Sequence, residues 1–100
     1  MLTWTKRIRG GQKDQPIRVR YETDLPGWGR ACVHSYVHAP GEMFLTCDSL
    51  GIELHPLGEI APEDAIKPAE AELERMLIQY VTWCAEALTA IHSGDTGQTA

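Results

Sequence analysis

Residues 31–47 read ACVHSYVHAPGEMFLTC, and these two largely apolar runs around a Pro-Gly pair decide the fold. Pro40 suits the second position of a β-turn, and Gly41 suits the third, which requires a positive φ. The pattern predicts a hairpin of two strands, 31–38 and 43–50, joined by the four-residue loop 39–42. In that register His34 faces Cys47, and Cys32 lies beside them on the same face.

Alternating polar and apolar residues predict further strands on both sides of this hairpin. Residues 1–8 and 16–23 form an antiparallel ribbon with one apolar and one arginine-bearing face, and a Pro-Gly turn at 26–27 follows it. Residues 51–57 form another strand, in which Pro56 indicates a sheet edge or an early end. The predicted sheet therefore has four or five antiparallel strands.

The rest of the chain predicts a helix. A short turn at 62–66 precedes a main helix over 68–92, because Pro68 favours the first helical position and Gly94 favours the C-terminal cap. We predict an α+β fold, an antiparallel meander of 4–5 strands packed against one long C-terminal α-helix. Residues 1–93 form this single domain, and residues 94–100 form a flexible C-terminal tail.

The composition indicates one small domain from a reducing compartment. The chain has 100 residues, three cysteines and a formal net charge of −5. An odd number of cysteines argues against a disulfide framework. No apolar run approaches the ~18 residues of a membrane span, and none follows the basic residues near the N-terminus as it would in a signal peptide. We therefore expect a cytoplasmic protein.

Charge is divided unevenly along the chain. Residues 1–30 carry seven basic and three acidic residues, whereas residues 31–100 carry two basic and eleven acidic ones. Two explanations are open. The halves bind different partners, or they attract each other within the fold or within a dimer.

The predicted hairpin brings Cys32, His34 and Cys47 together, and thiolates and imidazole are zinc ligands. The chain offers no fourth ligand at close spacing, because it has no C-x-x-C or H-x-x-H pair. We therefore expect these residues to pack in the sheet, with Cys84 of the helix against them, and we expect no metal and no cofactor. The chain also lacks a nucleophile elbow and a phosphate loop, so we expect no enzymatic activity.

The apolar side chains of the predicted helix span an arc of roughly 220°, whereas covering a sheet requires about 100°. We expect a central stripe to lie on the sheet, formed by Leu73, Leu77, Tyr80, Cys84, Leu88 and Ile91. Either loops of the same chain or a second chain covers the excess. We favour a homodimer through this helix, since two-fold homodimers are the commonest assemblies. The contact uses one of the two flanks of the stripe, either Met76, Trp83 and Ala87 or Ile78 and Ala85.

Two surfaces are candidates for binding a larger partner. The acidic region and a tryptophan between two glycines favour a basic, nucleic-acid-handling protein partner, and the residues expected to contact it are Trp28, Glu42, Glu53, Glu59, Glu63 and Asp64. The alternative is a nucleic-acid-binding regulator that uses the ribbon arginines Arg7, Arg9, Arg18 and Arg20. We rank a non-catalytic inhibitor first, because the chain is acidic and no aromatic residues lie among those arginines.

The segment Asp24-Leu25-Pro26-Gly27, which follows a strand and precedes the later helix, resembles Hic-type antitoxins. The small sheet-and-helix domain of that family neutralises an RNA-cleaving toxin. A helix follows the motif closely in that family, whereas two or three further strands intervene here, so no functional residues carry over. In size, acidity and lack of catalytic motifs the chain is also similar to small phage-encoded inhibitors of bacterial defence systems, including anti-CRISPR proteins. Both resemblances imply a regulator that binds another protein.

Overall fold

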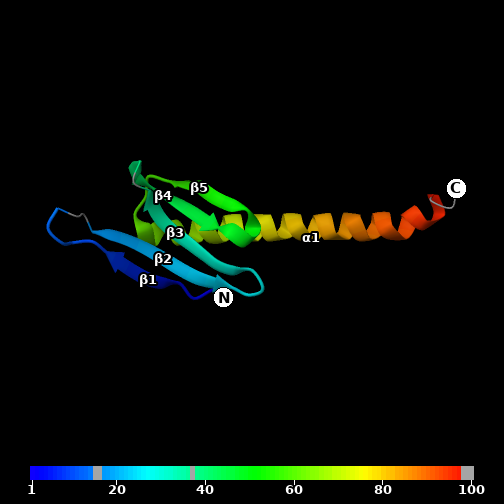
Figure 1. Cartoon of the computed structure of the whole chain (residues 1–100), viewed down its shortest axis with the longest axis horizontal. Helices are drawn as coiled ribbons and strands as arrows, with labels where there is room; N and C mark the ends of the chain where they lie inside the picture. The colour runs from blue at the N-terminus through cyan, green and yellow to red at the C-terminus, as the bar shows by residue number, and fades with distance from the viewer. Residues whose placement is uncertain (15–16, 37, 98–100) are drawn as a thin grey trace.

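The computed structural model describes residues 1–14, 17–36 and 38–97 and confirms the α+β prediction. Five antiparallel strands form one sheet in the order β1-β2-β3-β4-β5, followed by one long helix, α1 (Figure 1). The strands are β1 (Thr5–Arg9), β2 (Arg18–Leu25), β3 (Gly29–Tyr36), β4 (Ala39–Cys47) and β5 (Ile52–Gly58). Two short 3₁₀ turns, Asp48–Leu50 and Pro62–Ala65, flank β5, and α1 spans Ile66–Gly97.

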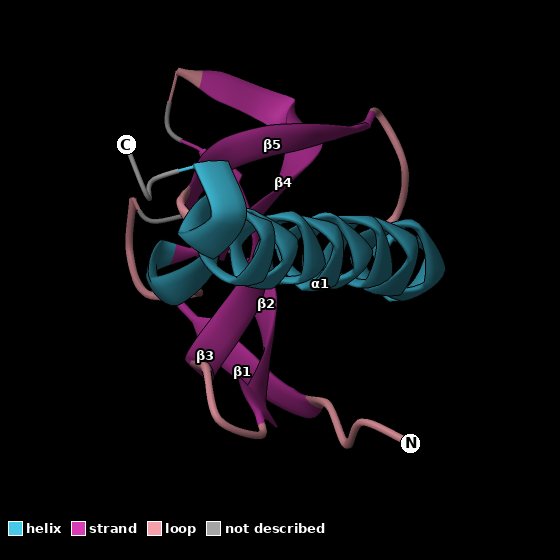
Figure 2. Cartoon of the chain, turned by 90° about the vertical axis from the view of Figure 1, so that its right-hand side faces the viewer, coloured by secondary structure: helices cyan, strands magenta, loops and turns pink. Residues whose placement is uncertain are grey.

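The first part of α1 lies across one face of the sheet (Figure 2). Ala69 and Leu73 of this part, and Ala65 of the turn before it, are fully or almost fully buried. They belong to the same core cluster as Val33 and Leu45, which are cross-strand partners and completely buried. Within the described residues, no helix lies over the opposite face of the sheet, which we call the outer face. The sheet therefore has one inner face packed against α1 and one outer face that is not covered by the described helix.

Two local predictions from turn chemistry are confirmed. The β2–β3 connection places Gly27 at φ 82°, and Trp28 N–H donates to the Leu25 carbonyl over 2.9 Å. A positive φ at the third position of a turn, directly after a proline at the second, is the type II arrangement. Pro56 lies in β5, which is an edge strand, so its missing N–H interrupts no inner ladder.

The predicted register of the β3–β4 hairpin is wrong. Val33 pairs with Leu45 and His34 pairs with Phe44. The predicted loop is also wrong, because residues 39–42 lie within β4 and Gly41 does not adopt the positive φ expected of a turn. An odd shift in register moves side chains to the other face of a sheet. The observed register places Val33 and Leu45 together on the buried side and leaves His34 partly hydrated outside. Cys47 therefore points to the inner face, away from His34.

The helix begins earlier and ends later than the pattern predicts. It starts at Ile66, two residues before Pro68, because a proline within the first turn interrupts no intrahelical hydrogen bond. It continues past Gly94 to Gly97, and residues 98–100 of the expected tail lie outside the described residues.

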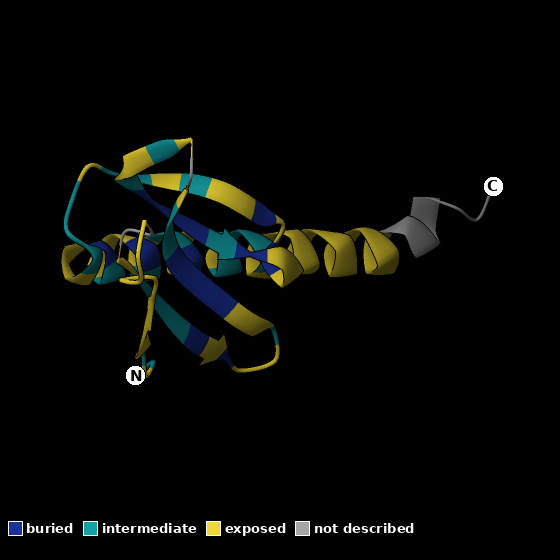
Figure 3. Ribbon diagram, turned by 60° about the vertical axis from the view of Figure 1, so that its left-hand side comes forward, coloured by how far each residue is buried: buried dark blue, intermediate teal, exposed yellow. Residues whose placement is uncertain are grey.

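The second half of α1 extends beyond the sheet into solvent (Figure 1). Every residue from 81 to 93 is exposed, as the yellow turns in Figure 3 show. The molecule measures 71 Å along its longest axis and 28 Å and 19 Å along the others. The expectation that Cys84 packs against the sheet is therefore wrong, because the sheet ends before the helix reaches it.

Candidate functional site

The exposed part of α1 carries an apolar row with the spacing of a coiled coil. Val81, Cys84, Leu88 and Ile91 follow one another at intervals of three, four and three residues, which places them at the a and d positions of a heptad repeat. We call these four residues the seam. Val81, Leu88 and Ile91 are 68%, 56% and 63% exposed. Such a row on an isolated helix is typical of a contact with another helix.

The residues predicted for the dimer interface lie at different distances from the seam. Ile78 is 59% exposed, and in the heptad it stands beside the seam, as does Ala87 on the other side. Met76 is half-buried against the core. Trp83 is half-exposed and packs edge-on against Tyr80, with ring centroids 5.3 Å apart. The seam itself was missed because all its apolar residues were assigned to the sheet or its flanks.

Trp28 and Tyr80 close the core where the helix leaves the sheet. Their ring centroids are 5.2 Å apart, and the Tyr80 hydroxyl donates to the Leu50 carbonyl over 3.2 Å. Trp28 is half-buried in this contact. The structure therefore places Trp28 at the edge of the core, next to the start of the seam.

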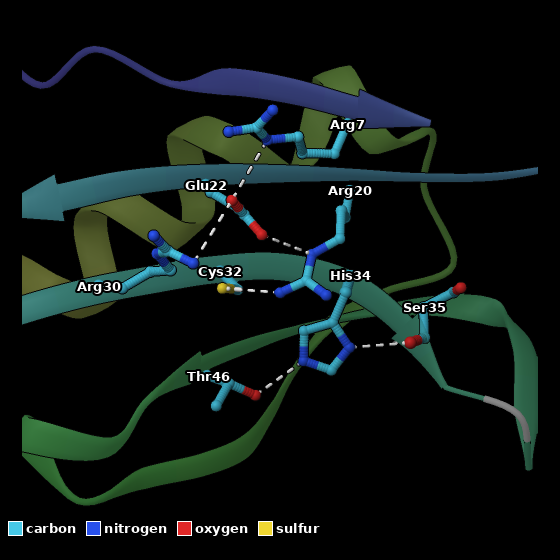
Figure 4. Close-up of polar contacts among 8 residues, drawn as sticks. All are labelled: Arg7, Arg20, Glu22, Arg30, Cys32, His34, Ser35 and Thr46. Atoms are coloured by element: carbon cyan, nitrogen blue, oxygen red, sulfur yellow. Dashed lines mark hydrogen bonds and ion pairs between the residues drawn. The ribbon is translucent and has the colours of Figure 1, made fainter. Parts of the chain in front are cut away.

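On the outer face, three arginines converge on one carboxylate (Figure 4). The Glu22 carboxylate lies 3.4 Å from Arg7 Nε, 3.1 Å from Arg20 Nε and 3.9 Å from Arg30 Nη1. The Arg20 Nε contact is an ion pair without hydrogen-bond geometry, and Arg20 Nη2 donates to Cys32 Sγ over 3.0 Å. One acid thus offsets part of the charge of three bases.

A pocket of about 370 Å³ opens beside this cluster. This volume falls within the range of small-molecule binding sites. Its lining comes from β1, β2, β3, β4 and the turn after β4, and consists of Arg9, Arg18, Val19, Arg20, Cys32, His34, Ser35, Thr46 and Asp48. We call it the outer pocket. The arginines of the pocket were predicted as a binding face. The other lining residues could be identified only once the strand register was known.

Hydrogen bonds hold the His34 ring at one wall of this pocket. Nδ1 lies 2.8 Å from the Ser35 carbonyl oxygen, and Nε2 lies 2.7 Å from Thr46 Oγ1 (Figure 4). The Thr46 hydroxyl in turn donates to the Glu53 carbonyl. This side of the pocket is therefore a preorganised polar wall.

The predicted acidic contact residues are spread over several elements of the fold. Glu42 is half-buried in β4, and Glu53 in β5 is exposed. Glu59, Glu63 and Asp64 are exposed between β5 and the start of α1. They do not form a single cluster in the described contacts.

The structure does not bring Cys32, His34 and Cys47 together. Cys32 and His34 face outward, Cys47 faces inward, and the described residues contain no group of three or more potential ligands that could hold a metal ion. Burial raises the pKa of the Cys47 thiol above its usual value, which keeps it protonated. Cys47 is therefore a core residue, and the chemistry of the outer face is that of arginine, histidine and hydroxyl groups.

The chain matches no protein-family model, no curated protein and no solved structure. Among the described residues, no helix combines the length and apolarity needed to cross a membrane.

Proposed function

We propose that this chain is a non-catalytic protein-binding module that pairs with a second copy of itself through the seam. The observation that carries the proposal is the exposure of residues 81–93 together with the heptad spacing of their apolar side chains. A helix held in water with this row uncovered gains apolar burial when a matching helix packs on it.

Antiparallel pairing fits the molecule better than parallel pairing. At 100° per residue, the seam lies roughly 60° around the helix from the row of Ala69, Leu73 and Tyr80 that faces the sheet. The first half of a parallel partner helix would run into the sheet, and Glu74 would face its own copy at an a position. An antiparallel partner instead places Val81 opposite Ile91 and Cys84 opposite Leu88, with the two sheets at opposite ends.

Sedimentation velocity over a concentration series tests this pairing. We expect the full chain to pass from an 11.1 kDa monomer to a dimer with rising concentration. Leu88→Glu places a charge in the seam and should give monomers. Ala90→Glu adds the same charge to the opposite side of the same exposed stretch and should leave the dimer intact. A wild-type chain that stays monomeric, or a Leu88→Glu dimer, would contradict the proposal.

The acidic side chains supply a second contact surface. Glu63 and Asp64 are exposed and lie at the far end of α1 from the seam, so the dimer leaves them free to meet a basic protein. This fits an inhibitor or antitoxin-like regulator of a nucleic-acid-handling partner, acting in a reducing, cytoplasmic compartment with all three cysteines unpaired. The double variant Glu63→Lys/Asp64→Lys should lose a partner captured at low salt, whereas Leu88→Glu should keep it. Equal capture by the double variant would contradict a role for these acids.

A second candidate function is binding of nucleic acid by the outer face. It is favoured by the pocket beside Arg9, Arg18 and Arg20, which the sequence pattern did not reveal. Affinity for a single-stranded oligonucleotide should fall with salt, and Arg18→Gln should reduce the slope by about 0.7 units for one lost phosphate contact. Absence of binding at low salt would exclude this function.

A further inference from the structure

The sheet pairs arginines directly across β1 and β2 in two successive positions. Arg7 faces Arg20, and Arg9 faces Arg18. Like charges directly opposite each other on one face of a sheet destabilise the pairing. Each of these pairs therefore favours a nearby anion.

Among the described residues, an acidic side chain pairs with the first of these arginine pairs and not with the second. Glu22 lies within ion-pair distance of Arg7 and Arg20. Arg9 and Arg18 have no ion-pair partner among the residues that the structure describes, although both line the outer pocket. Asp48 lines the same pocket without an ion pair to either. The second arginine pair thus stands in a cavity with its charge uncompensated.

We propose that the outer pocket binds a phosphate monoester of about nucleotide size, with Arg9 and Arg18 holding the phosphate. Arginine pairs phosphate oxygens through parallel N–H donors, and a phosphate held between Arg9 and Arg18 would supply the anionic partner that Glu22 supplies to Arg7 and Arg20. The volume of about 370 Å³ accommodates more than the phosphate. Cys32 and His34 of β3 also line the pocket, and they lie where the remainder of the ligand would extend from the two arginines.

The same chemistry is found in a free nucleotide and at the 5′-phosphate end of a nucleic acid strand. The inference deepens the second candidate function, since it uses the same face, but it does not require binding of internal phosphodiesters. The second candidate function and the pocket assignment can therefore be contradicted independently. An oligonucleotide without a terminal phosphate that binds as well as its phosphorylated form would support the second candidate function and overturn the pocket assignment.

The experiment is a calorimetric titration of the full chain with adenosine monophosphate, adenosine, and one oligonucleotide with and without a 5′-phosphate. We expect adenosine monophosphate to bind and adenosine to bind at least about tenfold more weakly. Preferred binding of the phosphorylated oligonucleotide over the mononucleotide would assign the strand end as the ligand, and the reverse would assign the free nucleotide. No binding of either phosphorylated ligand would overturn the proposal.

Variants assign the phosphate to the arginine pair. Arg9→Gln and Arg18→Gln should each weaken binding about tenfold or more. Arg75→Gln removes an arginine that is already paired with Glu72 on the helix and should bind like wild type. Both pocket arginines are exposed, so these variants should fold, which circular dichroism checks. A ligand that also raises the melting temperature of Arg18→Gln as much as that of wild type would contradict the assignment.

Discussion

Glu22 is the residue on which the charge balance of the outer face depends. The Glu22 side chain is 14% exposed, whereas those of Arg7 and Arg30 are about 60% exposed. Together with Arg20, three arginines therefore surround one largely buried carboxylate. An exposed ion pair contributes little by itself, but one carboxylate shared by several bases forms a network.

Glu22→Gln should therefore destabilise the protein. We expect a loss of about 1–2 kcal/mol at low salt, because two facing arginines then lose their only described carboxylate. The loss should shrink at high salt, since screening weakens the repulsion. Urea unfolding at two ionic strengths measures both effects. A Glu22→Gln variant with wild-type stability at low salt would show that the arginines are already relaxed in water.

Glu72 gives the stability a dependence on acid pH. Hydrogen bonds from Arg75, at 2.7 and 2.8 Å, lower the pKa of this carboxyl below its ordinary value of 4.5, and His55 at 3.8 Å adds to the effect. Since the folded pKa is the lower one, the contribution is present above pH 4.5 and is lost as the pH falls through the folded pKa.

Glu72→Gln should be less stable than wild type at pH 7 by about 0.5 kcal/mol, because Arg75 is exposed and the pair is screened. The difference should diminish as the pH falls below 4.5. Urea midpoints of both proteins between pH 7 and pH 3 test this. A difference that grows toward low pH would contradict the assigned sign.

At the scale of elements, one helix has two different environments along its length. Leu73 is 2% exposed beneath the sheet, and Leu88, fifteen residues later, is 56% exposed. The same residue type therefore stabilises the fold at one end of α1 and is available for pairing at the other.

The substitution leucine to alanine at these two positions separates the roles. Leu73→Ala should destabilise the monomer by about 2–5 kcal/mol, because it leaves a cavity between helix and sheet. Leu88→Ala should change monomer stability by less than about 0.5 kcal/mol but weaken dimerisation. Thermal unfolding at low concentration and sedimentation at high concentration measure the two effects. Similar destabilisation by both variants at low concentration would mean that Leu88 is covered within one chain.

The whole molecule is more extended than a compact domain of its length. Its Cα radius of gyration is 18.6 Å, whereas a compact domain of 100 residues has one of about 13 Å. The difference arises from the part of α1 beyond the sheet, which contributes length without contributing to the core (Figure 3).

Small-angle scattering distinguishes the arrangements of a dimer. A monomer extends 71 Å, and a parallel dimer would have nearly the same length because both sheets lie at one end. An antiparallel dimer overlapping over the seam should reach roughly 100 Å, since each sheet then lies beyond the other copy's helix end. A concentrated sample whose maximum dimension stays near the monomer value, with doubled mass, would favour the parallel arrangement.

The sequence alone determined the order and class of the elements, because alternation, turn residues and helical periodicity are local. Helices and strands are recognised by their 3.6-residue and two-residue periods, which are read within a few residues. The same holds for the turn at Pro26-Gly27 and for Pro56 as a sign of an edge strand. The excess apolar surface of the helix is likewise a property of its sequence, although the partner that covers it stays a proposal.

Tertiary structure decided which faces meet. The hairpin register depends on burying Val33 with Leu45 beneath the helix, a long-range condition that the local Pro40-Gly41 pair, which lies within β4, does not encode. With that register, His34 joins the arginines at the outer pocket, and Cys47 enters the core. The extent of the sheet that α1 can cover also depends on long-range contacts, since it is set by where the five paired strands end. The assembled fold shows that contact between α1 and the sheet stops near Tyr80, which leaves the seam exposed to water.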